Sequence, residues 1–114
     1  MDGLDSAAVI RTHVDAFNRG DINALMAGFT EDARWVTGET VILGYQGLTD
    51  FFGGAITSLK PQLTIMDLLA DGDRVACQLR EAVSGQVFFI AGFYRVRHGR
   101  IAAAKIYREG SADL

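Results

Sequence analysis

The first half of the chain repeats apolar side chains at the spacing of α-helices. Ser6 is a suitable N-cap for a first helix, and Gly20 is a natural residue for the left-handed turn that closes it. Asp21 then begins a short second helix over about residues 22–29, because its carboxylate can accept the free backbone N–H groups of the next turn. The apolar face of the first helix comprises Val9, Ile10, His13, Val14 and Phe17.

A third helix is predicted over residues 48–59, where apolar residues recur three and four positions apart and Pro61 stops the pattern. A first strand is expected earlier, at residues 33–37. Between this strand and the third helix, repeated glycines indicate an irregular connection that contains residues 41–43.

From residue 63 onward the pattern is that of β-strands. Four apolar runs are separated by Asp71-Gly72, Ser84-Gly85 and His98-Gly99, which are typical of hairpin turns. Three successive hairpins make an antiparallel meander, and helices segregated from such a sheet give an α+β domain whose helices cover one sheet face. The runs are residues 63–69, 74–83, 86–96 and 100–108.

The composition narrows the classes of protein to which the chain belongs. Its 114 residues suffice for one domain over residues 1–114, and a hydrophobic content of 49% argues against disorder. The net charge is −3 without a block of like charge, so we expect no nucleic-acid partner. The single cysteine, Cys77, excludes an internal disulfide. An acidic N-terminus and the lack of a long apolar run predict a cytoplasmic protein without a membrane segment.

The segment from residue 16 to residue 35 has a distinctive order of features. The run Ala-Phe-Asn-Arg-Gly-Asp-Ile-Asn-Ala-Leu joins two helices, and Glu-Asp-Ala-Arg-Trp at residues 31–35 leads into a strand. This order resembles the opening of the nuclear transport factor 2-like superfamily, in its SnoaL-like and ketosteroid-isomerase-like branch. The resemblance covers residues 6–109. It implies a cone-shaped, curved antiparallel sheet wrapped around three N-terminal helices, with a cavity between the concave sheet face and the first helix.

The resemblance and the alternation of strand side chains predict which residues line this cavity. Matching residues 99–101 to the family's last turn places the odd-numbered residues of 87–93 and the even-numbered residues of 104–108 inward. Matching residues 84–85 places the odd-numbered residues of 75–79 inward. The side chains expected to bind a ligand are Phe17, Trp35, Thr37, Cys77, Leu79, Phe89, Ala91, Ile106 and Arg108.

Two related enzyme activities are not expected, because the residues that they need are missing. A ketosteroid isomerase needs a carboxylate base, a protonated acid and a hydroxyl donor, and the resemblance puts these roles at Thr37, Ala91 and His13. A limonene-type epoxide hydrolase needs two carboxylates with an arginine between them. The corresponding positions are Val75, Cys77 and Ile106.

His13 is the candidate catalytic residue, because its unperturbed pKa lies near neutrality. The alternative is an inert histidine at the edge of the core, and we favour this structural interpretation because no orienting partner is evident. We also interpret Cys77 as a small buried residue rather than a nucleophile. Trp35 fits equally well a residue that stacks on a flat ligand and one that caps the core.

The outer face of the sheet is expected to be partly apolar, which indicates burial against another chain. The resemblance implies dimers built through this face, so we predict a homodimer. The residues predicted at the interface are Phe88, Ile90, Tyr94 and Tyr107.

Together these patterns predict a protein that binds a small, largely apolar molecule in the cavity. An enzymatic version of this hypothesis is isomerase-like or cyclase-like proton transfer assisted by His13. The alternative is a non-catalytic ligand-binding or dimeric interaction module of the same fold, and the scarcity of cavity carboxylates favours binding over hydrolysis. We assign no cofactor and no metal, because the aspartates near residue 70 have no accompanying histidine.

Overall fold

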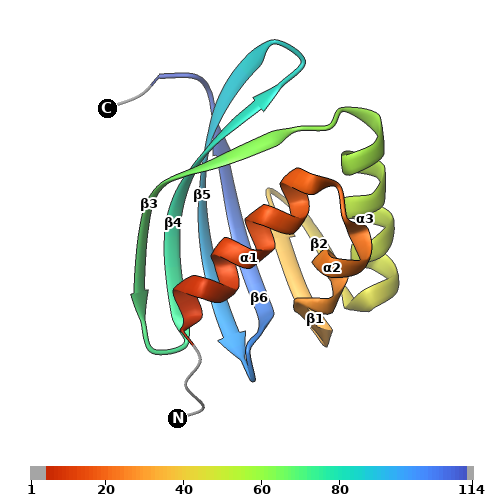
Figure 1. The fold of residues 1–114 in the computed structure, drawn as a ribbon, viewed down its shortest axis with the longest axis vertical. Helices are drawn as coiled ribbons and strands as arrows, with labels where there is room; N and C mark the ends of the chain where they lie inside the picture. Colours follow the sequence, from red (N-terminus) through yellow and green to blue (C-terminus); the bar gives the residue numbers. More distant parts are fainter. Residues whose placement is uncertain (1–4, 113–114) are drawn as a thin grey trace.

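Three helices lie against one face of a six-stranded sheet in the computed structural model, which describes residues 5–112 (Figure 1). The helices are α1 (Ser6–Arg19), α2 (Ile22–Ala27) and α3 (Gly44–Ser58). The strands are β1 (Phe29–Thr37), β2 (Thr40–Leu43), β3 (Gln62–Asp71), β4 (Arg74–Val83), β5 (Gln86–Arg97) and β6 (Arg100–Glu109). The α+β class with a curved sheet and three helices is therefore confirmed. No helix of the described residues is long and apolar enough to cross a membrane.

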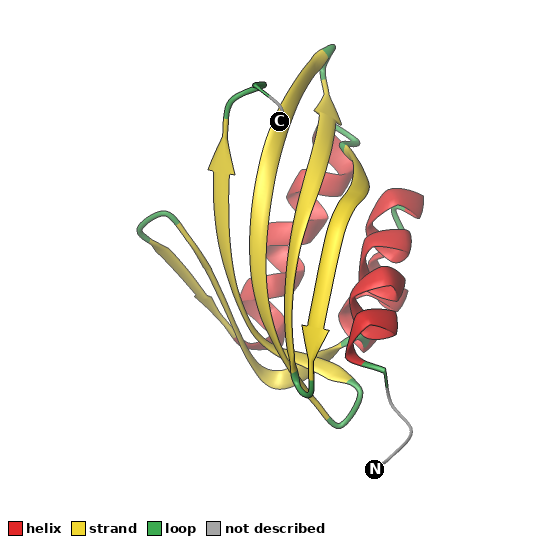
Figure 2. Ribbon diagram, turned by 90° about the vertical axis from the view of Figure 1, so that its left-hand side faces the viewer, coloured by secondary structure: helices red, strands yellow, loops and turns green. Residues whose placement is uncertain are grey.

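The strand order is β2-β1-β6-β5-β4-β3, and the predicted meander of β3 to β6 is confirmed. Figure 2 shows that the long strands are curved and that the helices lie on one side of the sheet. Strands β1 and β6 are parallel neighbours, although they are the first and the last strand along the chain. The prediction of an irregular connection at residues 41–43 is wrong. These residues form most of β2, which turns back at Gly38, where φ is 58°, and pairs with β1.

The ends of α1 and α2 follow simple capping chemistry, but the residue that caps α1 is not the predicted one. Asp5, not the predicted Ser6, caps α1, since the Asp5 carboxylate accepts the Ala7 N–H at 2.9 Å. The Ser6 hydroxyl donates instead to the carbonyl of Gly72 and so ties α1 to the β3–β4 turn. Gly20 closes α1 with φ 69° and Asp21 caps α2, both as predicted. The second helix ends earlier than predicted, because Phe29 already belongs to β1.

The predicted orientation of β5 is wrong because of a β-bulge in β6. The β5–β6 hairpin pairs Val96 with Ile101, but Arg95 pairs with Ala103, so that Ala102 is an extra residue. One extra residue reverses which side chains of the partner strand share a face with β6. The inward residues of β5 therefore include Phe88, Ile90, Gly92 and Tyr94, and the outward ones include Val87, Phe89, Ala91 and Phe93.

This reversal also changes the predicted interface on the outer sheet face. Phe88, Ile90 and Tyr94 face the helices, so their assignment to the interface is wrong. Tyr107 does lie on the outer face, where its ring packs edge-to-face against Phe93. The homodimer itself stays a prediction.

Replacing Gly92 by alanine tests how closely Tyr94 packs on its own strand. A Cβ at Gly92 would lie 2.6 Å from the Tyr94 hydroxyl oxygen and 2.7 Å from its Cε1. Because the buried ring must then move, we expect Gly92→Ala to lower the free energy of unfolding by roughly 1–3 kcal/mol. The measurement is urea unfolding followed by circular dichroism.

The matched control is Gly54→Ala in α3, where an added Cβ meets nothing within 4 Å. Gly54→Ala should raise the free energy of unfolding by about 0.5–1 kcal/mol, because alanine has less backbone freedom than glycine in the unfolded chain and loses less of it on folding. Equal stabilities of the two variants would contradict the close packing of Tyr94 over Gly92.

Candidate functional site

A cavity of about 370 Å³ lies between the helices and the inner face of the sheet. Helices α1 and α3 form one wall, and strands β1, β4, β5 and β6 form the other. Its volume is in the range that holds small molecules. The predicted residues that line it are His13, Phe17, Trp35, Thr37, Leu79, Ile106 and Arg108.

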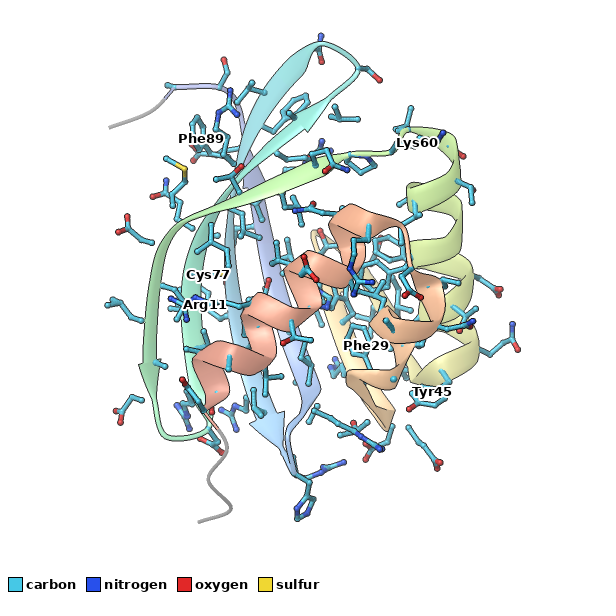
Figure 3. All side chains as sticks on the ribbon, viewed as in Figure 1. Arg11, Phe29, Tyr45, Lys60, Cys77 and Phe89 are labelled. Carbon is cyan, nitrogen blue, oxygen red and sulfur yellow. The ribbon has the colours of Figure 1, made fainter. Side chains whose placement is uncertain are left out.

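Three of the residues predicted to bind a ligand lie elsewhere. Phe89 and Ala91 belong to the outer face, so the prediction that they line the cavity is wrong, and its cause is the bulge in β6. Figure 3 labels Phe89 at the upper left, far from the helices that surround Phe29. Cys77 faces inward as predicted and is buried, but it does not line the cavity.

His13 is enclosed by aromatic side chains. The residue is only 6% exposed, and its Nδ1 atom has no hydrogen-bond partner among residues 5–112. Burial without a charged partner disfavours the imidazolium form and lowers the pKa of His13 to about 4, so the ring is neutral at pH 7. The centroid of its ring lies 5.5 Å from Phe29, 5.8 Å from Trp35, 6.0 Å from Phe52 and 6.3 Å from Tyr94.

Tyr94 also lines the cavity, and its hydroxyl group lies over Gly92 and beside Cys77. Gly92 leaves room for the Tyr94 ring, which lies across it on the inner face of β5. Burial raises the pKa of Tyr94 well above its usual range, so its hydroxyl keeps its proton and can donate a hydrogen bond. Burial also raises the pKa of the neighbouring Cys77 thiol, which supports the interpretation of Cys77 as a structural residue.

The cavity contains one carboxylate that was not predicted. Glu81, whose side chain is 13% exposed, accepts a hydrogen bond from Arg108 Nη2 at 2.6 Å. The Arg108 guanidinium, which is half exposed, also lies 4.2 Å from the centre of the Phe88 ring. Alternation along β4 could have revealed Glu81, because it is two residues beyond the inward-facing Leu79.

The two ends of the cavity differ in charge. His13 and Tyr94 are buried and neutral at one end, whereas Glu81 and Arg108 form an ion pair at the more exposed end. Among residues 5–112, no group of three potential metal ligands comes together. The arrangement can therefore form hydrogen bonds to neutral polar atoms deep in the cavity and to charged ones near its mouth.

Of the three positions that were compared with ketosteroid isomerases, the structure moves one, the acid position on β5, out of the cavity. Thr37 lines the cavity as predicted, but Ala91 does not face it. Strand β5 contains no acidic residue on either face. The cavity therefore still lacks a carboxylic acid on β5.

The buried neutral His13 predicts a loss of stability at acidic pH. The pKa of His13 is about 4 in the folded protein, against about 6.5 in an unfolded chain. Between these values the unfolded chain binds a proton that the folded protein does not. The free energy of unfolding should therefore fall by roughly 3 kcal/mol as the pH is lowered from about 6.5 to about 4.

Urea unfolding at several pH values measures this loss, and His13→Leu is the control. The variant keeps the size of the side chain but has nothing to protonate, so its stability should depend less on pH over the same interval. Identical pH dependence in the two proteins would show that His13 is not buried in the neutral form.

The comparisons with known proteins agree with this architecture. A putative ketosteroid isomerase from Kribbella flavida superposes with a TM-score of 0.84 at 21% identity, covering 96% of this chain and 81% of that chain. A LEH-like epoxide hydrolase from M. tuberculosis has a TM-score of 0.82 at 17% identity, covering 91% and 82%. A putative polyketide cyclase from Sinorhizobium meliloti has a TM-score of 0.80 at 18% identity, covering 90% and 99%.

These structural likenesses establish the fold, which serves isomerases, cyclases and epoxide hydrolases, but not an activity. No protein of curated function matches the sequence. Residues 10–104, which make up most of the chain, match the SnoaL-like domain. The chain therefore belongs to the SnoaL-like domain family.

Proposed function

We propose that the cavity binds a small, flat, largely apolar molecule that carries a carbonyl or hydroxyl group. The observation that supports this proposal is His13, a buried polar side chain with an unpartnered Nδ1 atom on the wall of a largely apolar cavity. An unpaired buried polar group costs roughly 1–3 kcal/mol. A ligand that forms a hydrogen bond with the imidazole offsets part of this cost.

The shape of the proposed ligand follows from the aromatic wall. Trp35 and Phe52 meet edge-to-face with their ring centroids 4.9 Å apart, and both line the cavity. Flat molecules bury most area against such rings. Because His13 and Tyr94 are both neutral, the part of the ligand that lies beside them is neutral too.

A second candidate function is proton transfer within the same cavity. His13 would accept a proton from the substrate while the Tyr94 hydroxyl donates a hydrogen bond to the oxygen that gains charge. A histidine with a pKa of about 4 is a weak base, which favours binding without chemistry in the free protein. Negative charge that develops on a bound substrate would raise this pKa, and the putative isomerase and cyclase of the same fold support keeping this candidate.

The binding proposal can be tested with 2-naphthol, a flat neutral molecule with one hydroxyl group, and with naphthalene, which lacks it. Trp35 is the only tryptophan, so its indole N–H gives one NMR signal that reports on the cavity. We expect both probes to shift this signal and the protein to prefer 2-naphthol by about tenfold, the effect of one hydrogen bond.

His13→Leu should abolish the preference for 2-naphthol while still binding naphthalene. Tyr107→Phe, on the outer sheet face, is the control and should bind both probes as the parent does. An unshifted indole signal at saturating probe, or an unchanged preference in His13→Leu, would refute the proposal.

A further prediction concerns steroid isomerisation. We expect no isomerisation of a 3-oxo-Δ5-steroid, because Thr37 is not a base and the inward residues of β5 include no acid. Absorbance of the conjugated product measures turnover. Turnover that Glu81→Gln abolishes would show instead that the carboxylate at the exposed end of the cavity serves as the base.

A further inference from the structure

The two charged residues of the cavity meet over strand β5 at the exposed end of the cavity. Glu81 on β4 is opposite Phe88 on β5, and Arg108 on β6 is opposite Ile90 on β5. Their side chains lean toward each other across β5, because Arg108 Nη2 donates to Glu81 Oε1 at 2.6 Å. Among the described residues that line the cavity, only these two are charged at pH 7. A largely apolar cavity thus holds a single ion pair.

This ion pair leaves hydrogen-bonding groups unused on both partners. A guanidinium group has several N–H donors, and within residues 5–112 Arg108 uses only the one at Nη2. Glu81 accepts through Oε1, and its second oxygen has no donor in the same part of the chain. The Phe88 ring, whose centre lies 4.2 Å from the guanidinium carbon, supports the guanidinium group from below. A donor and an acceptor therefore lie side by side, both able to bind a ligand.

Stability alone does not explain a carboxylate in this position. The Glu81 side chain is 13% exposed, and the Arg108 side chain is half exposed. Ion pairs that solvent reaches contribute little to stability, and removing a carboxylate from water has a cost of its own. Apolar residues at both positions would complete the apolar wall that Leu63, Leu79 and Val83 form beside them. A polar group of a ligand gives the ion pair a role that packing does not.

The ion pair lies well apart from the buried polar groups of the cavity. The Tyr94 hydroxyl lies over Gly92, and the ion pair lies over Phe88, four residues away along β5. Four residues of a strand span roughly 13 Å. A hydrogen bond of about 3 Å at each end leaves roughly 7 Å between the two polar atoms of a ligand that reaches both. Substituents at opposite ends of two fused six-membered rings have about this separation.

We propose that the Glu81–Arg108 pair selects ligands that carry a second polar group, at the opposite end of the molecule from the group beside His13. This inference rests on the proposed function, because it concerns the same ligand. The second group accepts from Arg108 and donates to Glu81, and a neutral hydroxyl or primary amide does both. Glu81 repels a carboxylate, and Arg108 repels an ammonium group. The ligand class is therefore a flat molecule with a neutral polar group at each end of its long axis.

Two isomers of dihydroxynaphthalene test the spacing in the parent protein. Naphthalene-2,6-diol has a hydroxyl group at each end of the molecule, whereas naphthalene-2,3-diol has both at one end. In titrations followed by the Trp35 indole signal, the 2,6-isomer should bind about tenfold more tightly than 2-naphthol, the effect of one additional hydrogen bond. The 2,3-isomer should bind about as tightly as 2-naphthol. Equal affinities of the two diols would overturn the proposal.

The anion 6-hydroxynaphthalene-2-carboxylate tests the charge. The parent protein should bind it more weakly than 2-naphthol, because its carboxylate meets that of Glu81. Glu81→Gln should raise its affinity about tenfold, since glutamine still accepts from Arg108 but does not repel an anion. Glu31→Gln removes the same charge from an exposed residue outside the cavity and should leave this affinity unchanged. An unchanged affinity in Glu81→Gln as well would overturn the selective role of Glu81.

Failure of this proposal and failure of the binding proposal give different results. If His13 makes the protein prefer 2-naphthol to naphthalene while both diols bind equally, the cavity binds a neutral ligand without selection by the ion pair. If none of the probes shifts the Trp35 indole signal, both proposals are wrong.

Discussion

The bulge at Ala102 determines which side chains the longest strand presents to each face of the sheet. Without the extra residue, β5 would pair with β6 in the register of its hairpin, and every β5 side chain would change faces. With it, Tyr94 lies inside against the helices, while Phe93 and Arg95 lie outside. The inward position of Tyr94 and the outward positions of Phe93 and Arg95 therefore depend on the same local irregularity, and β-bulges are over-represented next to active sites.

The cavity is built at a cost to the stability of the fold. The core around His13 resembles an ordinary aromatic core, because the ring centroids of Phe29, Trp35 and Phe52 lie 5.5, 5.8 and 6.0 Å from that of His13. An apolar residue in place of His13 would avoid an unpaired nitrogen and a pH-dependent loss of stability. Buried polar groups without partners are uncommon in native proteins, and they concentrate where a ligand or a reaction uses them.

Most of the fold could be predicted from local patterns, because these patterns act through short-range chemistry. The turn at Gly20, the Asp21 cap and the alternation that turns Trp35 and Leu79 inward depend on a few neighbouring residues each. The bulge could not be predicted in this way. It lies in a run of small residues with no glycine to indicate a break, and its position is decided by pairing with β5 and β1. All errors in the predicted orientation of β5, including Phe89 and Ala91, follow from it.

The sequence alone also could not predict which arginines have a charged partner on each face of the sheet. Arg108, at the mouth of the cavity, has Glu81 as an ion-pair partner and an aromatic ring beneath it. Arg95, on the outer face, has another arginine across the strand pair and an alanine on its other side. A carboxylate entering the cavity would compete with Glu81 for Arg108, and beside His13 it would meet no cation. The buried end of the cavity therefore suits the neutral ligand that we propose better than it suits a carboxylate.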